Sequence, residues 1–401
     1  MLNIILYILM TLSLISWIIY LIVIIKNYHK IPPLSKHSQG ARLKNTPLVS
    51  IIIPTRNESR RISKCIETLK LQKYSKLQII IVDDSTDNTV EVVSNIVAKD
   101  KRFKIIKQEP LTPGWIGKPF ALQQGSKLAK GEWLLFIDAD TYYDSVLIER
   151  AIEFALKNKL DMLSLIPCYI CKSFWEKIIE PIPLGEILFA NPCAKVNDPK
   201  SKVSAAGGWF IIIKHSIFNK VGGYHSIKGR IADDVELAQL VKSSCFKIGY
   251  INAQSMINIR MYEKFSEIWD GWSKNIFLGV IQKRKIKSNF LQILILFALL
   301  FALFELLILP FSLMISSLLI FLIIKSLSWL YLSLFAFLIW SVSIFISVFV
   351  QRVYHIGKAM YAPLELELGG IIVMGITINS ALKTMSKKEV TWKGKKYPVE
   401  E

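Results

Sequence analysis

The stretch Val49-Ser-Ile-Ile-Ile-Pro54 is apolar and rich in β-branched residues, and the polar segment Thr55-Arg-Asn-Glu58 follows it directly. An apolar run of this length that ends at a proline and a polar loop predicts a buried strand. Residues 77–82 (LQIIIV) have the same character and end at the acidic pair Asp83-Asp84. The two runs therefore predict two buried strands with polar and acidic side chains at their carboxyl ends.

A third run, residues 132–137 (EWLLFI), ends in the same way at Asp138-Ala-Asp140. Strands without polar alternation that are separated by helices are typical of an α/β fold with a mostly parallel sheet. Ligands of such sheets bind beyond the carboxyl ends of the strands, so the acidic residues are expected at one binding edge. The sequence lacks the dinucleotide fingerprint and the P-loop. It predicts helices over 60–71, 89–99 and 118–130 and a strand over 103–107.

The composition points to a membrane protein. The chain has 401 residues, a formal net charge of +19 and 52% hydrophobic residues. A disordered chain contains few apolar residues, so this composition excludes disorder. A basic excess favours a membrane surface or an anionic ligand as partner. Nucleic acid is the rival partner, and no motif in the sequence supports it.

Residues 2–25 form an apolar run without a charged residue, and Lys26, Lys30 and Lys36 follow it. A run long enough to span a bilayer, with positive charge after it, predicts a transmembrane anchor over 1–26 and not a cleaved signal peptide. The basic linker 27–46 is then expected on the cytoplasmic side of the cell membrane, together with the domain after it.

A second apolar block covers residues 289–382. Its parts are 290–324, interrupted by Pro310, then 329–350 and 363–382. These lengths fit three to four segments that cross the membrane or re-enter it. The basic tail 383–401 favours the cytoplasmic side and an even number of crossings.

Residues 47–260 are sufficient for one α/β domain between the two membrane blocks. Residues 261–288 are predicted to form an amphipathic helix at the membrane interface, because Phe265, Trp269 and Trp272 fall on about one face before a basic end. A core helix is the alternative.

Cys168 and Cys171 have the spacing of half a zinc or redox site. No second pair of this kind occurs, and a cytoplasmic domain disfavours disulfides. We therefore expect small buried residues without a metal or redox role.

The acidic residues at the strand ends are the strongest chemical signal. Asp138 and Asp140 can hold a hard divalent cation, Mg2+ or Mn2+, whose shell water and phosphate oxygens complete. An ordinary acidic turn is the alternative for an isolated pair. Asp83 and Asp84 can accept hydrogen bonds from a base and a ribose. The alternative there is a turn and helix cap formed by residues 85–87.

Three further motifs are candidates for ligand contacts. Gly114-Trp-Ile-Gly-Lys118 places a cation at a predicted helix start, which suits a phosphate. The glycine pairs before Trp209 and Tyr224 suit a sugar or a lipid, or are two tight turns. Asp233 and Asp234 precede a helical stretch, where one acid can act as a general base and both can act as first-turn acids.

The ordered set of motifs resembles the inverting family-2 glycosyltransferases of the GT-A fold. The resemblance covers about residues 49–279. Its GWIGK segment and flanking apolar runs are similar to membrane-anchored lipid glycosyltransferases of the ceramide glucosyltransferase-like, hopanoid-associated and carotenoid types. The motifs that carry it are PTRNE (54–58), VDDSTDNT (82–89), GWIGKPFA (114–121), DAD (138–140), GGW (207–209) and ADDVEL (232–237).

The resemblance implies a Rossmann-like cytoplasmic domain with a mostly parallel mixed sheet, an N-terminal transmembrane helix and a C-terminal helical membrane domain. It also implies roles for single residues. Thr55, Asn57, Glu58, Asp83 and Asp84 would line the nucleoside pocket, Lys118 would approach the diphosphate, Asp138 would meet ribose or metal, and Asp140 would ligate the metal. Gly208, Trp209 and Arg260 would contact sugar or acceptor, Asp234 would be the base, and Asp233 would replace the usual Glu.

One departure from the family pattern concerns processive synthases, which carry a Gln-x-x-Arg-Trp motif. Here Arg260 is followed by Met261, so a polymer-extruding role is disfavoured. The resemblance implies metal-dependent transfer of a sugar, with a uridine donor and glucose as the guess, to a hydroxyl of a membrane lipid. The alternatives are a polyprenyl-phosphate sugar transferase and a membrane protein that binds nucleotide sugar without catalysis.

Overall fold

The computed structural model describes residues 2–30, 33–36, 46–230, 232–284, 286, 288–386, 390–392 and 395–397. Most of the predicted basic linker 27–46 and part of the predicted tail 383–401 lie outside these residues. The chain divides into two compact units. The α/β unit consists of His29–Tyr169, Asn191–Met261 and Val390–Glu401. The helical unit consists of Met1–Tyr28, Ile170–Ala190 and Tyr262–Glu389.

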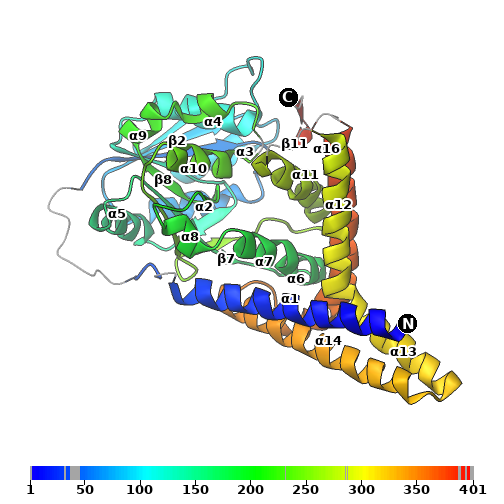
Figure 1. Cartoon of the computed structure of the whole chain (residues 1–401). Coiled ribbons are helices and arrows are strands. Elements are labelled where there is room, and N and C mark those ends of the chain that lie inside the picture. Colours follow the sequence, from blue (N-terminus) through cyan, green and yellow to red (C-terminus); the bar gives the residue numbers. More distant parts are fainter. Residues whose placement is uncertain are drawn as a thin grey trace. The chain divides into compact units, whose positions relative to one another are not determined.

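A seven-stranded mixed sheet forms the centre of the α/β unit (Figure 1). Its first four strands, in the order β3-β2-β1-β4, are parallel. β8 is antiparallel to both β4 and β6, and β9 is parallel to β6. The prediction of a mostly parallel α/β sheet is therefore confirmed. The strands are β1 (Val49–Thr55), β2 (Leu77–Asp83), β3 (Phe103–Lys107), β4 (Trp133–Phe136), β6 (Met162–Ile166), β8 (Ile211–Lys214) and β9 (Ile248–Asn252).

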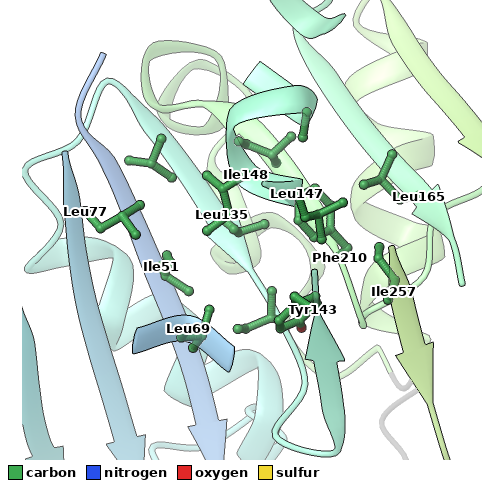
Figure 2. Packing of buried hydrophobic residues seen from close by; sticks show 14 of the residues in the cluster. Ile51, Leu69, Leu77, Leu135, Tyr143, Leu147, Ile148, Leu165, Phe210 and Ile257 are labelled. Atoms are coloured by element: carbon green, nitrogen blue, oxygen red, sulfur yellow. The ribbon is translucent and has the colours of Figure 1, made fainter. Parts of the chain in front are cut away.

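Alternate residues of the central strands face opposite sides of the sheet, as the two-residue period of a strand requires. Ile51 and Ile53 of β1 face the main core, whose helical side is formed by α2 (Ile62–Lys70), α3 (Thr89–Val97) and α5 (Leu147–Lys157). Figure 2 shows this packing around Ile51, Leu135 of β4 and Leu147 of α5. Because both faces are covered, the strands read as unbroken apolar runs.

The opposite face of the sheet is covered by α4 (Gly117–Lys127), the helix that carries Lys118 near its start. α4 approaches the sheet closely at Gly125. A Cβ atom on Gly125 would lie 2.4 Å from Cγ2 of Ile52 and 3.1 Å from Cγ2 of Val82. The position of α4 over β1 and β2 therefore depends on the absence of a side chain at this residue.

Gly125→Ala is expected to destabilise the α/β unit by about 1–3 kcal/mol, because the new methyl group overpacks a buried helix–sheet contact. Gly279→Ala is the matched control. Gly279 lies inside a helix, and no atom lies within 4 Å of the place that its Cβ would take, so alanine there should stabilise by about 0.5–1 kcal/mol. Thermal unfolding followed by tryptophan fluorescence distinguishes the two; equal shifts for both variants would contradict the close packing at Gly125.

Smaller elements complete the α/β unit. A three-stranded sheet has the order β5-β10-β7 and is formed by Thr141–Tyr143, Ile257–Ile259 and Cys168–Tyr169. The helices are α8 (Cys193–Asn197), α9 (His215–Lys220), the short 3-10 helix η1 (Gly223–Ile227) and α10 (Asp233–Ser243), and the hairpin is β11 (Val390–Trp392) with β12 (Lys395–Tyr397). All five cysteines are free thiols. The prediction of buried side chains holds for Cys65 and Cys193 but is wrong for the half-buried Cys168 and Cys171 and for the exposed Cys245.

Within the described residues, four helices are long and apolar enough to cross a membrane. They are Leu2–His29, Asn289–Ile324, Leu327–Tyr354 and Ala359–Met385. The apolar helices predicted at both ends of the chain are thus confirmed, and the number and direction of crossings stay predictions. α1 (Leu2–Lys30) packs beside α14 (Leu327–Tyr354) through a cluster centred on Met10 and Leu332 (Figure 1).

Two of these apolar helices contain a π-helical turn. Asn289–Ile324 consists of α12 (Asn289–Leu303), the π-helical segment η2 (Phe304–Ile308) and α13 (Leu309–Ile324), with Pro310 at the start of α13. A proline removes one backbone donor, which accounts for an interruption at this place. The last helix consists of η3 (Ala359–Tyr361), α15 (Ala362–Leu364), the π-helical segment η4 (Glu365–Gly369) and α16 (Gly370–Met385).

The predicted interfacial helix is α11 (Phe265–Arg284). It contacts α16, and Ile268, Trp272 and Phe277 on its face are buried within the helical unit. Phe265 and Trp269 are half-buried. The core-helix alternative therefore describes the buried face, while contact of the remaining surface with a membrane stays a prediction. α6 (Phe174–Ile179) and α7 (Pro181–Ala190) complete this unit.

Candidate functional site

The carboxyl ends of β1 and β2 place Thr55 and Asp83 side by side, because the two residues are partners in the parallel register. Both are buried. Thr55 Oγ1 donates a hydrogen bond of 2.7 Å to Asp83 Oδ1, and Ser85 donates to the same carboxylate from its N (3.0 Å) and its Oγ (2.6 Å). These three donors fix the orientation of the Asp83 side chain, whose two oxygens have room for a further hydrogen bond.

The loops after β1 and β2 are bonded to each other. Asn57 has a left-handed backbone (φ 52°), which asparagine tolerates better than most residues. Its N donates to Ser85 Oγ (2.9 Å), and its Oδ1 accepts from Thr86 N (2.9 Å). Asn57 therefore holds the acidic loop in place, in addition to any contact with a ligand.

Arg56 is a residue of this edge for which the sequence prediction assigned no role. Its Nη1 donates to Asp84 O (2.9 Å) and forms an ion pair with the Asp84 carboxylate. The signal was present in the sequence as the cation of the PTRNE motif. Asp84 is thus charge-compensated at the strand end, whereas Asp83 is satisfied by neutral donors.

The turn expected over residues 85–87 is present. Asp87 Oδ1 accepts from Thr89 N (3.0 Å) at the start of α3, and Thr89 Oγ1 accepts from Glu58 N (2.9 Å). The cap explanation of this segment therefore holds for Asp87. It also fixes Glu58, which is largely buried at the same edge.

A second group of residues surrounds Lys118 at the start of α4. Lys118 Nζ lies 2.6 Å from Asp138 Oδ1 and 4.0 Å from Asp233 Oδ1. Burial alone would lower the pKa of Lys118, but the charges of Asp138, Asp233 and Asp234 raise it above its usual range. The ammonium is therefore charged at any physiological pH and offsets part of the negative charge of the three acids.

Gly208 joins the GGW loop to the acid pair. Its N donates a hydrogen bond of 2.9 Å to Asp234 Oδ2. A Cβ on Gly208 would lie 2.6 Å from Lys118 Nζ and 2.9 Å from Asp138 Oδ2. A side chain at this position would displace the ends of Lys118 and Asp138, so glycine lets the loop approach the undisturbed ion pair.

Asp234 lies in the first turn of α10 and is half-buried. Its Oδ1 also accepts from Val235 N (2.8 Å). Burial raises the pKa of Asp234, while Lys118 and the two backbone donors partly counteract this and Asp138 adds to it. A carboxylate with a raised pKa and fixed orientation has the properties of a general base.

Asp138 and Asp140 follow β4, whose Phe136 is paired with Ile52 of β1. Both acids lie near Cys65. Burial raises the pKa of this thiol, and the negative charges of Asp140 and Asp138 raise it further. Among the residues that the structure describes, no three His, Cys, Asp or Glu side chains form a metal site. Two carboxylates nevertheless fit Mg2+ or Mn2+, because such ions take one or two protein carboxylates and fill the shell with water and phosphate.

Trp209 and Arg260 are the two remaining predicted residues. Trp209 Nε1 donates to Leu165 O (2.5 Å), and its ring packs edge-on against Tyr169. Because the indole N–H is already used within the protein, a ligand could contact only the ring of Trp209. Arg260 directly follows β10. Burial raises the pKa of Tyr142 on the paired strand β5, and the positive charge of Arg260 partly counteracts this. Roles for Trp209 and Arg260 at the ligand stay predictions.

Known proteins resemble parts of this chain. Residues 50–221 match the family model described as Glycosyl transferase family 2. The 4,4'-diaponeurosporenoate glycosyltransferase of Staphylococcus haemolyticus is 25% identical over 240 residues, which are 58% of this chain and 62% of the relative. An uncharacterized glycosyltransferase of Haemophilus influenzae is 34% identical over 119 residues, 29% of this chain and 46% of that protein. The chain thus spans less than two thirds of the length of these relatives.

A solved structure resembles the chain over nearly its whole length. The mannosyltransferase PcManGT from Pyrobaculum calidifontis, in complex with GDP-Man and Mn2+, matches with a TM-score of 0.58 and 17% identity. The match covers 97% of this chain and 100% of that chain. At this identity the likeness concerns the fold, which is GT-A-like.

Proposed function

Because residues 50–221 match the Glycosyl transferase family 2 domain, we propose that the protein transfers a sugar from a nucleotide-diphosphate donor to a hydroxyl of a membrane lipid. The observation that carries this proposal is the convergence of Lys118, Asp138, Asp233 and Asp234 around Gly208. A cation beside a set of acids suits a diphosphate leaving group and a base within one site. The four long apolar helices supply the reason to expect a lipid acceptor.

The donor is proposed to lie along the carboxyl edge of the sheet. The nucleoside would contact Asp83, whose carboxylate is buried and oriented by Thr55 and Ser85. Asn57, Glu58 and Asp84 would complete this pocket. Lys118 would move from Asp138 toward the diphosphate, since an ammonium binds a phosphate more strongly than a shared carboxylate in a crowded acid cluster. A uridine donor is the first candidate, with glucose as the sugar to test first.

Asp234 is proposed as the general base. It takes the proton from the acceptor hydroxyl, and the hydroxyl oxygen forms a bond to the anomeric carbon from the face opposite the nucleotide. The bond between that carbon and the diphosphate oxygen breaks, and the nucleoside diphosphate leaves with the electron pair. An α-linked donor therefore gives a β-linked product. Asp138 and Asp140 would hold a divalent cation, Mg2+ or Mn2+, which when bound supplies neutralising charge at the diphosphate.

The setting is proposed to be the cell membrane, with several crossings and the α/β unit on the cytoplasmic side. Lys26 in the last turns of α1, Lys36 after this helix and the basic tail after residue 382 support this orientation through the positive-inside rule. Acceptor chemistry would then take place close to lipid headgroups.

The defining experiment incubates the purified full-length protein with a lipid extract and a panel of nucleotide sugars, followed by mass spectrometry. We expect one lipid to gain one hexose mass with one donor. Gain of repeated hexose units would contradict the single-transfer proposal, and binding of donor without any product would favour the non-catalytic alternative.

A second candidate acceptor is favoured by one of the relatives. The name 4,4'-diaponeurosporenoate glycosyltransferase denotes an acceptor that is a carboxylate. A carboxylate, like the phosphate of a polyprenyl phosphate, is already ionised at neutral pH and needs no base. The acceptor of this chain is then an anionic lipid oxygen, and Asp234 would be dispensable for proton removal.

A further inference from the structure

Tyr224 has a polar atom that the proposed mechanism does not use. The residue lies in η1 and is 0% exposed. Its ring packs against Phe136 (ring centroids 5.1 Å apart) and Phe218 (5.7 Å), so its position is set by the core. Within the described part of the chain, its hydroxyl has no hydrogen-bond partner.

The backbone before Tyr224 is built to place this ring. Gly222 (φ 83°) and Gly223 (φ 55°) both have left-handed backbone, and a Cβ on Gly223 would lie 2.5 Å from the Phe218 ring. The two glycines thus allow the chain to turn so that the ring of Tyr224 packs against the core. Phenylalanine would meet the same packing needs without burying a hydroxyl, which costs about 1–3 kcal/mol when left unsatisfied.

The surroundings of Tyr224 point to a partner in another state of the site. Tyr224 lines a small cavity together with Lys118, Asp138, Gly208 and Asp233. Burial raises the pKa of the phenol well above its usual range, and Asp233, Asp234 and Asp138 raise it further. The hydroxyl therefore stays protonated and can act as a donor beside carboxylates that are acceptors.

We propose that Tyr224 is a positioning residue whose hydroxyl donates a hydrogen bond to Asp233 when Lys118 leaves the acid cluster. With Lys118 in place, its ammonium lies 4.0 Å from Asp233 Oδ1. When Lys118 moves toward a diphosphate, its positive charge is no longer beside Asp233. This movement is the one step that rests on the proposed function. The rigidly packed phenol then holds Asp233, and with it the first turn of α10 that carries Asp234.

A stability cycle tests this exchange without any substrate. Tyr224→Phe in the wild-type background should raise the melting temperature by about 2–6 °C, because a buried hydroxyl without a hydrogen-bond partner is removed and no hydrogen bond is lost. In the Lys118→Met background, where the ammonium is absent, Tyr224→Phe should lower the melting temperature by about 2–6 °C. A purely structural ring gives the same shift in both backgrounds, and that result overturns the proposal.

Tyr74→Phe is the matched control. Tyr74 is another buried tyrosine, and its hydroxyl donates to the carbonyl oxygen of Pro47, in contacts that do not involve Lys118. Loss of the Tyr74 hydroxyl should lower the melting temperature by the same amount in the wild-type and Lys118→Met backgrounds. A context-dependent shift for Tyr74→Phe as well would show that Lys118→Met changes the whole domain, and would overturn the specific reading for Tyr224.

Turnover supplies a second readout. Tyr224→Phe should lower kcat for sugar transfer by at least about tenfold with the donor KM within about twofold, because a hydrogen bond to a charged group is lost only after donor binding. Unchanged kcat overturns the proposal. If the wild-type protein transfers no sugar, the proposed function fails, whereas the stability cycle still decides the inference.

Discussion

Asp234→Asn is expected to lower kcat for transfer to a lipid hydroxyl by about 10³-fold, the middle of the range for loss of a general base. Asparagine keeps the shape of the side chain but cannot take a proton. Its carbonyl oxygen can still accept one of the hydrogen bonds that Gly208 N and Val235 N now donate to Asp234. Donor binding should therefore change by no more than a few-fold, measured by calorimetric titration of the nucleoside diphosphate.

Asp161→Asn is the matched control for this variant. Asp161 pairs with Lys214 Nζ at 2.8 Å and accepts from Lys247 N at 3.0 Å, so it also combines a charge with a backbone donor. Its loss should affect stability slightly and leave kcat unchanged. Near-normal turnover by Asp234→Asn would contradict the base assignment. With a carboxylate or phosphate lipid as the accepted substrate, it would establish the second candidate acceptor.

The pH dependence of kcat gives a further check on Asp234. The base works in its ionised form, which is present above its pKa and is lost as the pH falls through that value. Burial raises the pKa of Asp234 above the usual 3.8. Loss of activity on the acid side is therefore expected at a higher pH than for an exposed aspartate, and a flat profile down to pH values near 4 would contradict this.

Removal of divalent metal is expected to abolish transfer, with recovery on addition of Mg2+ or Mn2+. Asp140→Asn should raise the metal concentration for half-maximal activity by at least about tenfold, since loss of even an outer-shell partner costs about 10–100-fold. Asp140 follows β4 at the same edge as Asp138, and their carboxylates are the oxygen donors that these ions prefer. The measurement is product formation against metal concentration after chelation.

Asp100→Asn is the control for the metal prediction, because Asp100 is an acid paired with Arg102 at 2.7 Å, away from the acid cluster around Lys118. It should leave the metal dependence unchanged. Full activity in the presence of excess chelator would show that the charge at the diphosphate is neutralised by Lys118 and other cations of the chain. The proposed metal role of Asp138 and Asp140 would then be abandoned.

Much of the edge of the sheet was predictable from local sequence. The run 49–54 and its two counterparts are apolar because both faces of the sheet are covered, and each ends in polar residues because the chain leaves the core there. The register of β1 with β2 then places Thr55 beside Asp83, as parallel strands that end together require. The two glycines before Tyr224 were visible as a motif, but the packing of its ring against Phe136 and Phe218 and its relation to Lys118 were not.

The relations between distant residues depended on the tertiary structure. Arg56 pairs with Asp84 across two loops, and Gly208 reaches Asp234 from a segment 26 residues earlier in the chain. Strands β6, β8 and β9 were also not predicted, nor was the antiparallel pairing of β8 with β4 and β6. No local pattern encodes such contacts, because they arise from where separate segments meet after the sheet is assembled.

The sequence by itself determined the fold class, the apolar helices at both ends and the acidic character of one sheet edge, since each of these follows from hydrophobic period and local residue type. Tertiary structure alone decided which acids share a cation. Lys118 lies between Asp138 and Asp233 because α4, β4 and α10 converge there. Burial at this place raises the pKa of Asp234. Charge in a site is a property of the assembled surroundings and not of the residues taken singly.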